Sequence, residues 1–267
     1  MLDEEHRMPA AAIGTQIKEW RSRRRLSQME LALDAEISTR HLSFIETGRA
    51  RPSPEMIERL AERLEVPHRA RNALLLAAGY APGYGEEPLD APAMAGVRAI
   101  VEHLLKGHEP YPAIAVDRHW NMIAANGAIG ILIEQVAPHL LTPPVNVIRI
   151  ALHPDGLAPQ IVNFGEWRDH IIDRLDRQIE AGADAELAAL RAEVAAYPGR
   201  YNDNEGPVAN PIAVPLVLDT VAGRIAFLST ITIFGTPVEV TLSELAIEAF
   251  FPADAASAET LRKLLPA

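Results

Sequence analysis

The sequence predicts an α+β protein of two domains: an N-terminal bundle of five helices, and a C-terminal domain with one antiparallel sheet of five strands. The 267 residues are enough for two hydrophobic cores. Residues 13–79 show only helical periodicity, whereas residues 95–267 mix helical stretches with β-branched runs. Residues 80–94 contain prolines and glycines without periodicity, so we expect a linker there, and an N-terminal tail over residues 1–12.

The N-terminal domain carries a start signal for each helix. Ile13, Ile17 and Trp20 form the apolar stripe of the first helix. Serine, a preferred N-cap, precedes the second, third and fourth helices, and Ser27 and Glu30 have the spacing of a capping box. Pro67 opens the fifth helix, which Gly79 ends. The expected helices cover residues 13–24, 27–33, 38–46, 53–64 and 67–78.

The C-terminal domain is expected to begin with a helix over residues 95–105. Further helices should follow Asn126 and Asn163 and cover residues 184–196, and an apolar stripe from Trp167 to Ile179 marks the longest of them. Runs of β-branched residues between turn signals predict the strands. These strands are expected over residues 113–116, 121–125, 212–218, 223–234 and 237–242.

Residues 26–48 have the spacing of a helix-turn-helix motif. Apolar residues at Leu31, Ile37, Leu42 and Ile45 let two short helices share one core, with the small Ala32 where they cross. The first turn of the second helix then points outward and fits the major groove of DNA. The motif therefore predicts a protein that reads double-stranded DNA.

The same segment, Leu26-Ser-Gln-Met-Glu-Leu-Ala, followed by Ile45-Glu-Thr-Gly and Pro52-Ser, resembles the Cro/C1-type (XRE) family of lambda-repressor-like helix-turn-helix proteins. The resemblance implies that Gln28 clamps a phosphate and braces the reading helix, that Arg40 pairs with guanine, and that Phe44 meets a thymine methyl. Where the family has Gly, this chain has Glu36, and a left-handed backbone there costs about 1 kcal/mol. The expected DNA contacts are Gln28, Ser38, Thr39, Arg40, His41, Ser43, Phe44, Arg49 and Arg51.

Segments beyond the linker, among them Val116-Asp-Arg-His-Trp-Asn-Met and Leu152-His-Pro-Asp-Gly-Leu, resemble the MmyB-like regulator ligand-binding domain. The resemblance implies a PAS-like fold and an apolar small-molecule ligand, with a fatty acid as leading candidate. The apolar candidates could equally be ordinary core residues. The expected apolar wall consists of Trp120, Met122, Val147, Ile150, Phe164, Trp167, Ile171, Phe227 and Phe234, and the expected polar mouth consists of Asn146, Arg149, His153 and Arg168.

Charge and composition limit the remaining possibilities. The net charge of -11 comes from residues 86–267, which carry 12 Lys and Arg against 24 Asp and Glu; residues 1–85 carry 13 against 12. An acidic second domain cannot neutralise phosphates and suits a sensor or a dimerisation role. The chain has no cysteine, which excludes disulfides and thiolate chemistry. Without a signal peptide or a long apolar stretch, we expect a cytoplasmic protein that does not enter membranes.

Catalysis finds little support in the sequence. The segment His153-Pro-Asp-Gly fits a turn as well as it fits a catalytic pair of His153 and Asp155. The sequence contains neither a phosphate-binding loop nor a nucleophile motif. We therefore expect no enzyme, no metal and no cofactor beyond a fatty-acid-like ligand. Three alternatives remain: a ligand-responsive regulator, a regulator whose second domain only dimerises or contacts proteins, and an enzyme with a DNA-binding module. A homodimer on a near-palindromic operator is the expected DNA complex.

Overall fold

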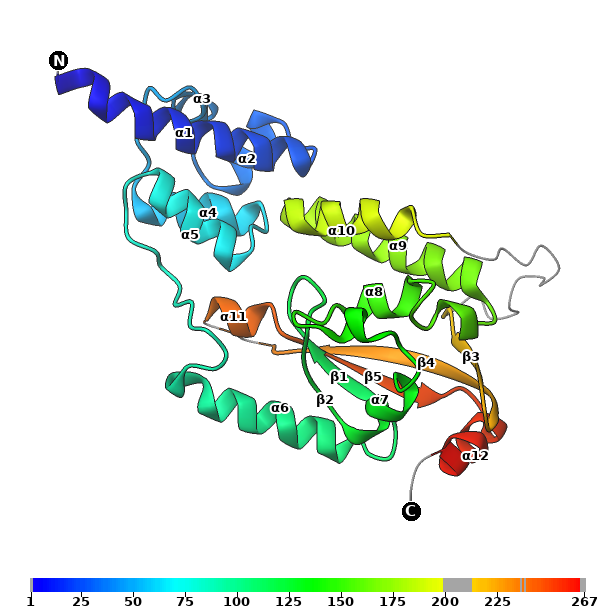
Figure 1. The fold of residues 1–267 in the computed structure, drawn as a ribbon. Helices are drawn as coiled ribbons and strands as arrows, with labels where there is room; N and C mark the ends of the chain where they lie inside the picture. Colours follow the sequence, from blue (N-terminus) through cyan, green and yellow to red (C-terminus); the bar gives the residue numbers. More distant parts are fainter. Residues whose placement is uncertain (1, 199–212, 236, 238, 265–267) are drawn as a thin grey trace. The chain divides into compact units, whose positions relative to one another are not determined.

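The computed structural model describes residues 2–198, 213–235, 237 and 239–264, and the chain divides into two compact units (Figure 1). The first comprises Met1–Glu86 with Val238–Val240, and the second comprises Glu87–Pro237 and Thr241–Ala267. The first is helical, and the second contains a five-stranded antiparallel sheet with helices. The predicted fold class is confirmed.

The first unit contains helices α1 (Leu2–Arg23), α2 (Gln28–Asp34), α3 (Thr39–Glu46), α4 (Pro54–Arg63) and α5 (His68–Ala77). Ser27, Ser38 and Ser53 each accept a hydrogen bond from the backbone amide three residues on, and the capping box is present. The prediction was wrong at the start of the first helix, because α1 begins at Leu2 rather than at Ile13. Ile13, Ile17, Leu31, Leu42 and Ile57 are fully buried in a common core.

Residues 80–86, expected as the start of the linker, pack on the helices of the first unit. The side chain of Asn72 donates to the carbonyl of Tyr84 at 2.9 Å and accepts from its amide at 3.0 Å. The Tyr84 ring stacks on His68, with ring centroids 4.1 Å apart. The amide of Val240 donates to the carbonyl of Gly85 at 2.8 Å. This segment therefore belongs to the first unit.

The sheet of the second unit has the strand order β2-β1-β5-β4-β3, with every neighbouring pair antiparallel. Its strands are β1 (Ala113–Val116), β2 (Met122–Ala125), β3 (Leu216–Thr220), β4 (Gly223–Ile233) and β5 (Ala246–Pro252). The predicted last strand, residues 237–242, was wrong. Val240–Ser243 forms the short helix α11, and β5 follows it. The central position of β5, between β1 and β4, buries Glu248, which interrupts the apolar pattern of the strand.

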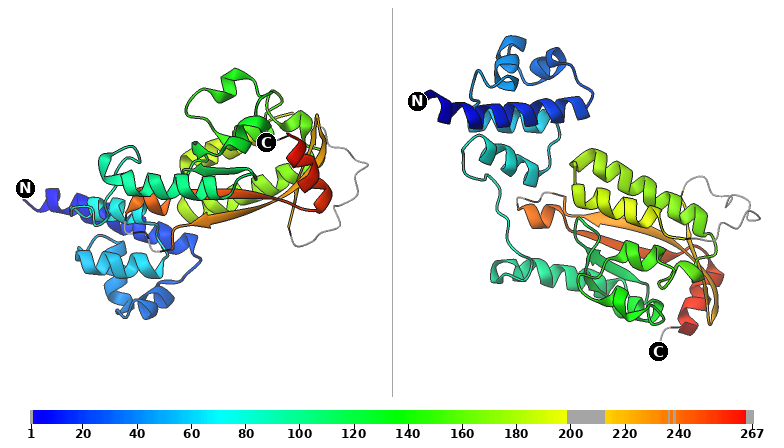
Figure 2. Two further views of the ribbon diagram at one scale, coloured as in Figure 1. Left: turned by 90° about the horizontal axis from the view of Figure 1, so that it is seen from below. Right: turned by 45° about the horizontal axis from the view of Figure 1, so that its top comes forward.

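Helices cover both faces of this sheet (Figure 1). Helix α6 (Ala95–Gly107) packs on the face that presents Ala113, Ala115 and Ile247. The other face is covered by α7 (Gly127–Leu132), α8 (Val147–Leu152), α9 (Phe164–Gly182) and α10 (Ala185–Ala195), and α9 and α10 lie side by side (Figure 2). The predictions included neither α8 nor α12 (Ala255–Leu264). Short 3-10 helices within the described residues connect these elements: η1 (Pro92–Met94), η2 (Pro138–Leu141) and η3 (Ala158–Gln160).

Candidate nucleic-acid interface and ligand pocket

Helix α3 buries one side and presents the other to solvent. Leu42 and Ile45 are fully buried, whereas Thr39 and Arg40 in the first turn are exposed. The guanidinium carbons of Arg40 and Arg49 lie 5.3 Å and 5.9 Å from the centroid of the Phe44 ring. Cation–π attraction therefore holds two arginines around one aromatic ring on the exposed side of the helix. This face combines a cationic fork, a hydroxyl group and an apolar ring, the groups that recognise base edges.

A buried ion pair fixes α3 to the helices before it. Glu46, at the end of α3, accepts from Arg21 Nε at 2.7 Å, from Arg21 Nη2 at 3.0 Å and from Gln28 Nε2 at 2.7 Å. The side chains of Glu46 and Arg21 are 1% and 12% exposed. Burial alone raises the pKa of Glu46, but the hydrogen bonds from Arg21 and Gln28 outweigh it and hold that pKa below its ordinary value. Gln28 thus contacts the reading helix, as expected of a brace, while its phosphate contact stays a prediction.

The other predicted DNA contacts surround this face or support it. Ser38 caps α3 by accepting from the amide of His41 at 3.1 Å. Ser43 is half-buried, and Arg51 lies over the ring of Tyr80 at 4.6 Å. Glu36 has a φ of 55°, the left-handed conformation expected where the family has Gly. Neither Glu46 nor Arg21 was predicted as a support of α3, although Glu46 is part of the Ile-Glu-Thr-Gly segment.

The second unit contains an apolar cavity of about 90 Å³ between the sheet and the helices on its α9 side. Its wall comes from all five strands and from the helices α7, α8 and α9, and most of the predicted wall residues contribute to it. Phe164, by contrast, is buried in the surrounding core, and Phe234 packs on the opposite face of the sheet. The predicted residues that line the cavity are Trp120, Met122, Val147, Ile150, Trp167, Ile171 and Phe227.

One ion pair borders this cavity. Arg174 on α9 donates through both terminal nitrogens to Glu248 Oε1 on β5, at 3.2 Å and 3.3 Å, and both residues line the cavity. The guanidinium also lies 4.4 Å from the centroid of the Trp120 ring, whose Nε1 donates to Gln178 at 2.9 Å. Trp120 adopts a φ of 66°, which is unusual for a bulky residue. Arg174 and Glu248 were not predicted, because neither helical nor strand periodicity indicates that they meet.

The four residues predicted for the polar mouth lie elsewhere among the described residues. Asn146 caps α8 by accepting from the Arg149 amide at 3.1 Å, and Arg149 forms a bidentate pair with Glu193 at 2.9 Å and 2.8 Å. His153 follows α8, and Arg168 donates to the carbonyl of Ala195. The structure thus gives Asn146, Arg149 and Arg168 local partners and does not place any of the four in the cavity wall.

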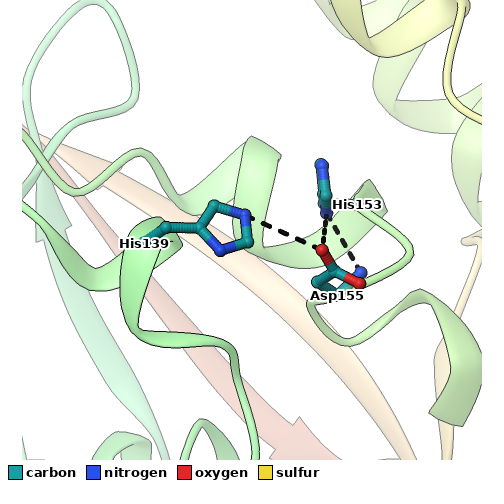
Figure 3. A group of neighbouring side chains, drawn as sticks. All are labelled: His139, His153 and Asp155. Carbon is teal, nitrogen blue, oxygen red and sulfur yellow. Dashed lines mark hydrogen bonds and ion pairs between the residues drawn. The ribbon is translucent and has the colours of Figure 1, made fainter.

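The turn predicted at His153-Pro-Asp-Gly is present, and it brings His153 and Asp155 close to His139 (Figure 3). Residue spacing does not predict that this third residue, His139, lies close to the turn. Over the part of the chain that the structure describes, no helix combines the length and the apolar character needed to cross a bilayer.

Comparisons with known proteins cover both units. Residues 97–264 match the model of the MmyB-like transcription regulator ligand binding domain, and residues 12–74 match a helix-turn-helix domain. No curated protein matches the chain. A crystal structure of the clp gene regulator ClgR from Corynebacterium glutamicum is similar, with 20% identity, 38% of this chain and 95% of that chain covered, and a TM-score of 0.24.

Proposed function

The chain belongs to the family of the MmyB-like transcription regulator ligand binding domain and carries a helix-turn-helix domain before it, and from this premise we propose that an apolar carboxylic acid controls its binding to DNA. The DNA-reading half of the proposal depends on the exposed first turn of α3, with Arg40 as its base-reading cation. The controlling half depends on the apolar cavity with Arg174 in its wall.

Arg174 is the group that would hold the polar end of the ligand. An apolar cavity with one guanidinium suits a molecule with a long apolar body and a carboxylate, such as a fatty acid, because the guanidinium can bind that carboxylate with two hydrogen bonds. Glu248 forms an ion pair with Arg174 in this structure, so an incoming carboxylate competes with Glu248 for the same cation. The walls supply the rest of the binding energy by apolar contact.

The size of the cavity implies that binding changes the domain. A volume of about 90 Å³ equals the share of about three water molecules, whereas pockets for drug-sized ligands begin at about 300 Å³. A fatty acid therefore requires the walls to separate. A ligand that binds this opened form better than the closed one shifts the population between them, which is the condition for regulation.

We further propose that the protein acts in the cytoplasm as a homodimer on a near-palindromic operator. Residues 1–85 are nearly neutral, so one helix-turn-helix domain gains little nonspecific attraction to phosphates. Two half-sites read together supply the missing affinity and specificity. Light scattering that gives the mass of a monomer, both alone and with operator DNA, would count against this dimer.

Two experiments test the proposal. Solvent extraction and mass spectrometry of the pure chain, before and after incubation with a fatty-acid mixture, should recover an acid from the wild type. Arg174→Met should lose it, and Arg177→Met, which removes an exposed arginine from the same helix, should keep it. Glu248→Gln should bind the acid more tightly, because the competitor for Arg174 has lost its charge. If no acid is recovered from any sample, the proposal that the domain binds an apolar carboxylic acid is overturned.

The DNA half is tested separately by gel shift on the promoter region of the protein's own gene. Wild type should select one duplex, and Arg40→Ala should lose that selection. Equal and weak binding of every duplex by both proteins would remove Arg40 from the base-reading role. Repeating the assay with and without the extracted acid measures whether the two halves are coupled.

A further inference from the structure

Two imidazoles and one carboxylate meet beside α8 (Figure 3). His139 belongs to η2, His153 directly follows α8, and Asp155 lies in the next turn. His139 Nε2 and His153 Nδ1 each lie 3.9 Å from Asp155 Oδ2. One donor atom from each of the three side chains lies within 4.8 Å of the other two. The three residues thus form a compact set of metal-binding atoms.

Neither imidazole ring forms a hydrogen bond with the carboxylate in this cluster. A distance of 3.9 Å is too long for a hydrogen bond between either ring and the carboxylate. His153 Nδ1 accepts from the backbone amide of Asp155 at 3.0 Å, so this nitrogen offers a lone pair in this arrangement. Neutral imidazole and ionised carboxylate are the forms that bind metal ions.

Backbone hydrogen bonds hold the cluster in place. The amide of Ala137 donates to the carbonyl of Asp155 at 3.0 Å and so joins the start of η2 to the turn. The amide of Gly156 donates to the carbonyl of His153 at 2.9 Å. A Cβ at Gly156 would lie 2.1 Å from the carbonyl oxygen of Ile150, so the tight turn requires glycine. The backbone is therefore fixed before any ion arrives.

We propose that His139, His153 and Asp155 bind a divalent transition-metal ion, Zn²⁺ being the best match to two imidazoles and one carboxylate. Tetrahedral Zn²⁺ with bonds of about 2.0–2.1 Å keeps its donors about 3.3 Å apart, so these donors move inward by about 0.5–1.5 Å. The His139 side chain is 58% exposed and is free to make this movement by rotation. The ion takes the lone pair of His153 Nδ1 in place of the Asp155 amide.

The site adjoins the wall of the apolar cavity. Ile150 and Ala151 precede His153, Leu157 follows Asp155, and all three of these apolar residues line the cavity. An ion bound at the turn fixes the two wall segments that the turn connects. The metal site is independent of the ligand proposal, since it depends on different side chains.

Titration of Zn²⁺ into the tag-free, chelator-treated full chain tests the site, with Co²⁺ as a coloured replacement whose visible absorption reports the geometry. Wild type should show one saturable site per chain. His139→Ala and Asp155→Asn should each weaken it at least about tenfold, and lowering the pH through the range in which histidine protonates should release the ion. His103→Ala removes an exposed histidine on α6, outside the cluster, and should bind like the wild type.

Two results would overturn the proposal. One is the absence of saturable binding in the wild type, and another is equal affinity of the wild type, His139→Ala and Asp155→Asn. The second result would place the ion elsewhere, for example at His119, which lies 3.0 Å from Asp184 and 3.3 Å from Glu186. Circular dichroism of each variant separates loss of a ligand from loss of the fold.

Discussion

Glu46→Gln removes the negative charge that Arg21 and Gln28 hold at the end of the reading helix. The substitution keeps the shape of the side chain but leaves the guanidinium of Arg21, 12% exposed, without a counter-charge. Breaking a buried pair of this kind costs about 3–5 kcal/mol. Arg21 also donates to the carbonyl of Leu26 at 2.8 Å, and glutamine keeps one acceptor, so we expect the lower limit, about 3 kcal/mol.

Hydrogen exchange of the α3 amides in the full chain measures this loss locally. A cost of about 3 kcal/mol lowers their protection by about two orders of magnitude at neutral pH, since each factor of ten corresponds to about 1.4 kcal/mol. Glu62→Gln, which removes an exposed carboxylate from α4, should change the free energy of opening by no more than about 0.5 kcal/mol. Equal protection of α3 in the wild type and in Glu46→Gln would refute the assignment.

The pH dependence gives a second check on Glu46. Its pKa in the folded chain lies below the ordinary value of 4.5, so its contribution to stability is fully present above 4.5. The contribution is lost as the pH falls through the lower, folded-state pKa. The difference in α3 protection between the wild type and Glu46→Gln should therefore be full at neutral pH and shrink in acid. A difference that stays constant down to the most acid conditions would contradict this account.

Three further predictions concern other parts of the chain. Arg40→Ala should lower the binding free energy by about 1–3 kcal/mol on the preferred duplex and by less on other duplexes. Arg49→Ala should weaken binding to all duplexes alike and reduce the slope of log affinity against log salt concentration by about one. Identical gel-shift profiles of the two variants would contradict the assignment of Arg40 to bases and Arg49 to phosphates. Glu36→Gly should stabilise the first unit by up to about 1 kcal/mol in urea unfolding, because relief of about 1–2 kcal/mol of strain exceeds a backbone entropy cost of about 0.5–1 kcal/mol; a loss of stability would show that Glu36 is unstrained. Phe227→Ala, at a position only 1% exposed, should destabilise the second unit by about 3–5 kcal/mol; a loss below about 1 kcal/mol would mean that the cavity wall collapses around the change.

Local signals explain which parts of the fold the sequence predicted. Ser27, Ser38 and Ser53 act within one turn of their own helices, so the limits of α2, α3 and α4 follow from neighbouring residues alone. The position of strand β5 could not be predicted from neighbouring residues in this way. Its alternation contains Glu248, which is buried only because Arg174 on a distant helix pairs with it. The β-branched residues at 237–242 favoured a strand, but Val240–Ser243 forms the helix α11.

The candidate sites also divide into features predicted from neighbouring residues and features that depend on distant ones. The exposed side of α3 could be predicted, because helical spacing determines which side chains share a face. The brace at Glu46 and the cation at Arg174 depend on partners far away in the sequence, and no periodicity connects them. The backbone hydrogen bond from the amide of Ala137 to the carbonyl of Asp155 brings His139 close to Asp155, and the sequence alone does not indicate this bond either. The apolar wall was easier, because buried apolar residues gather in any fold.

The packing of residues 80–86 on the first unit bears on gene fusion and on the exchange of modules between regulators. Asn72 is 7% exposed, and its amide group depends on Gly83 and Tyr84 for its hydrogen bonds. A chimera that joins residues 1–79 to a foreign domain would leave this amide buried without those partners, at a cost of about 1–3 kcal/mol. Recombination breakpoints that preserve a working DNA-binding module should therefore fall after Glu86 rather than directly after Gly79.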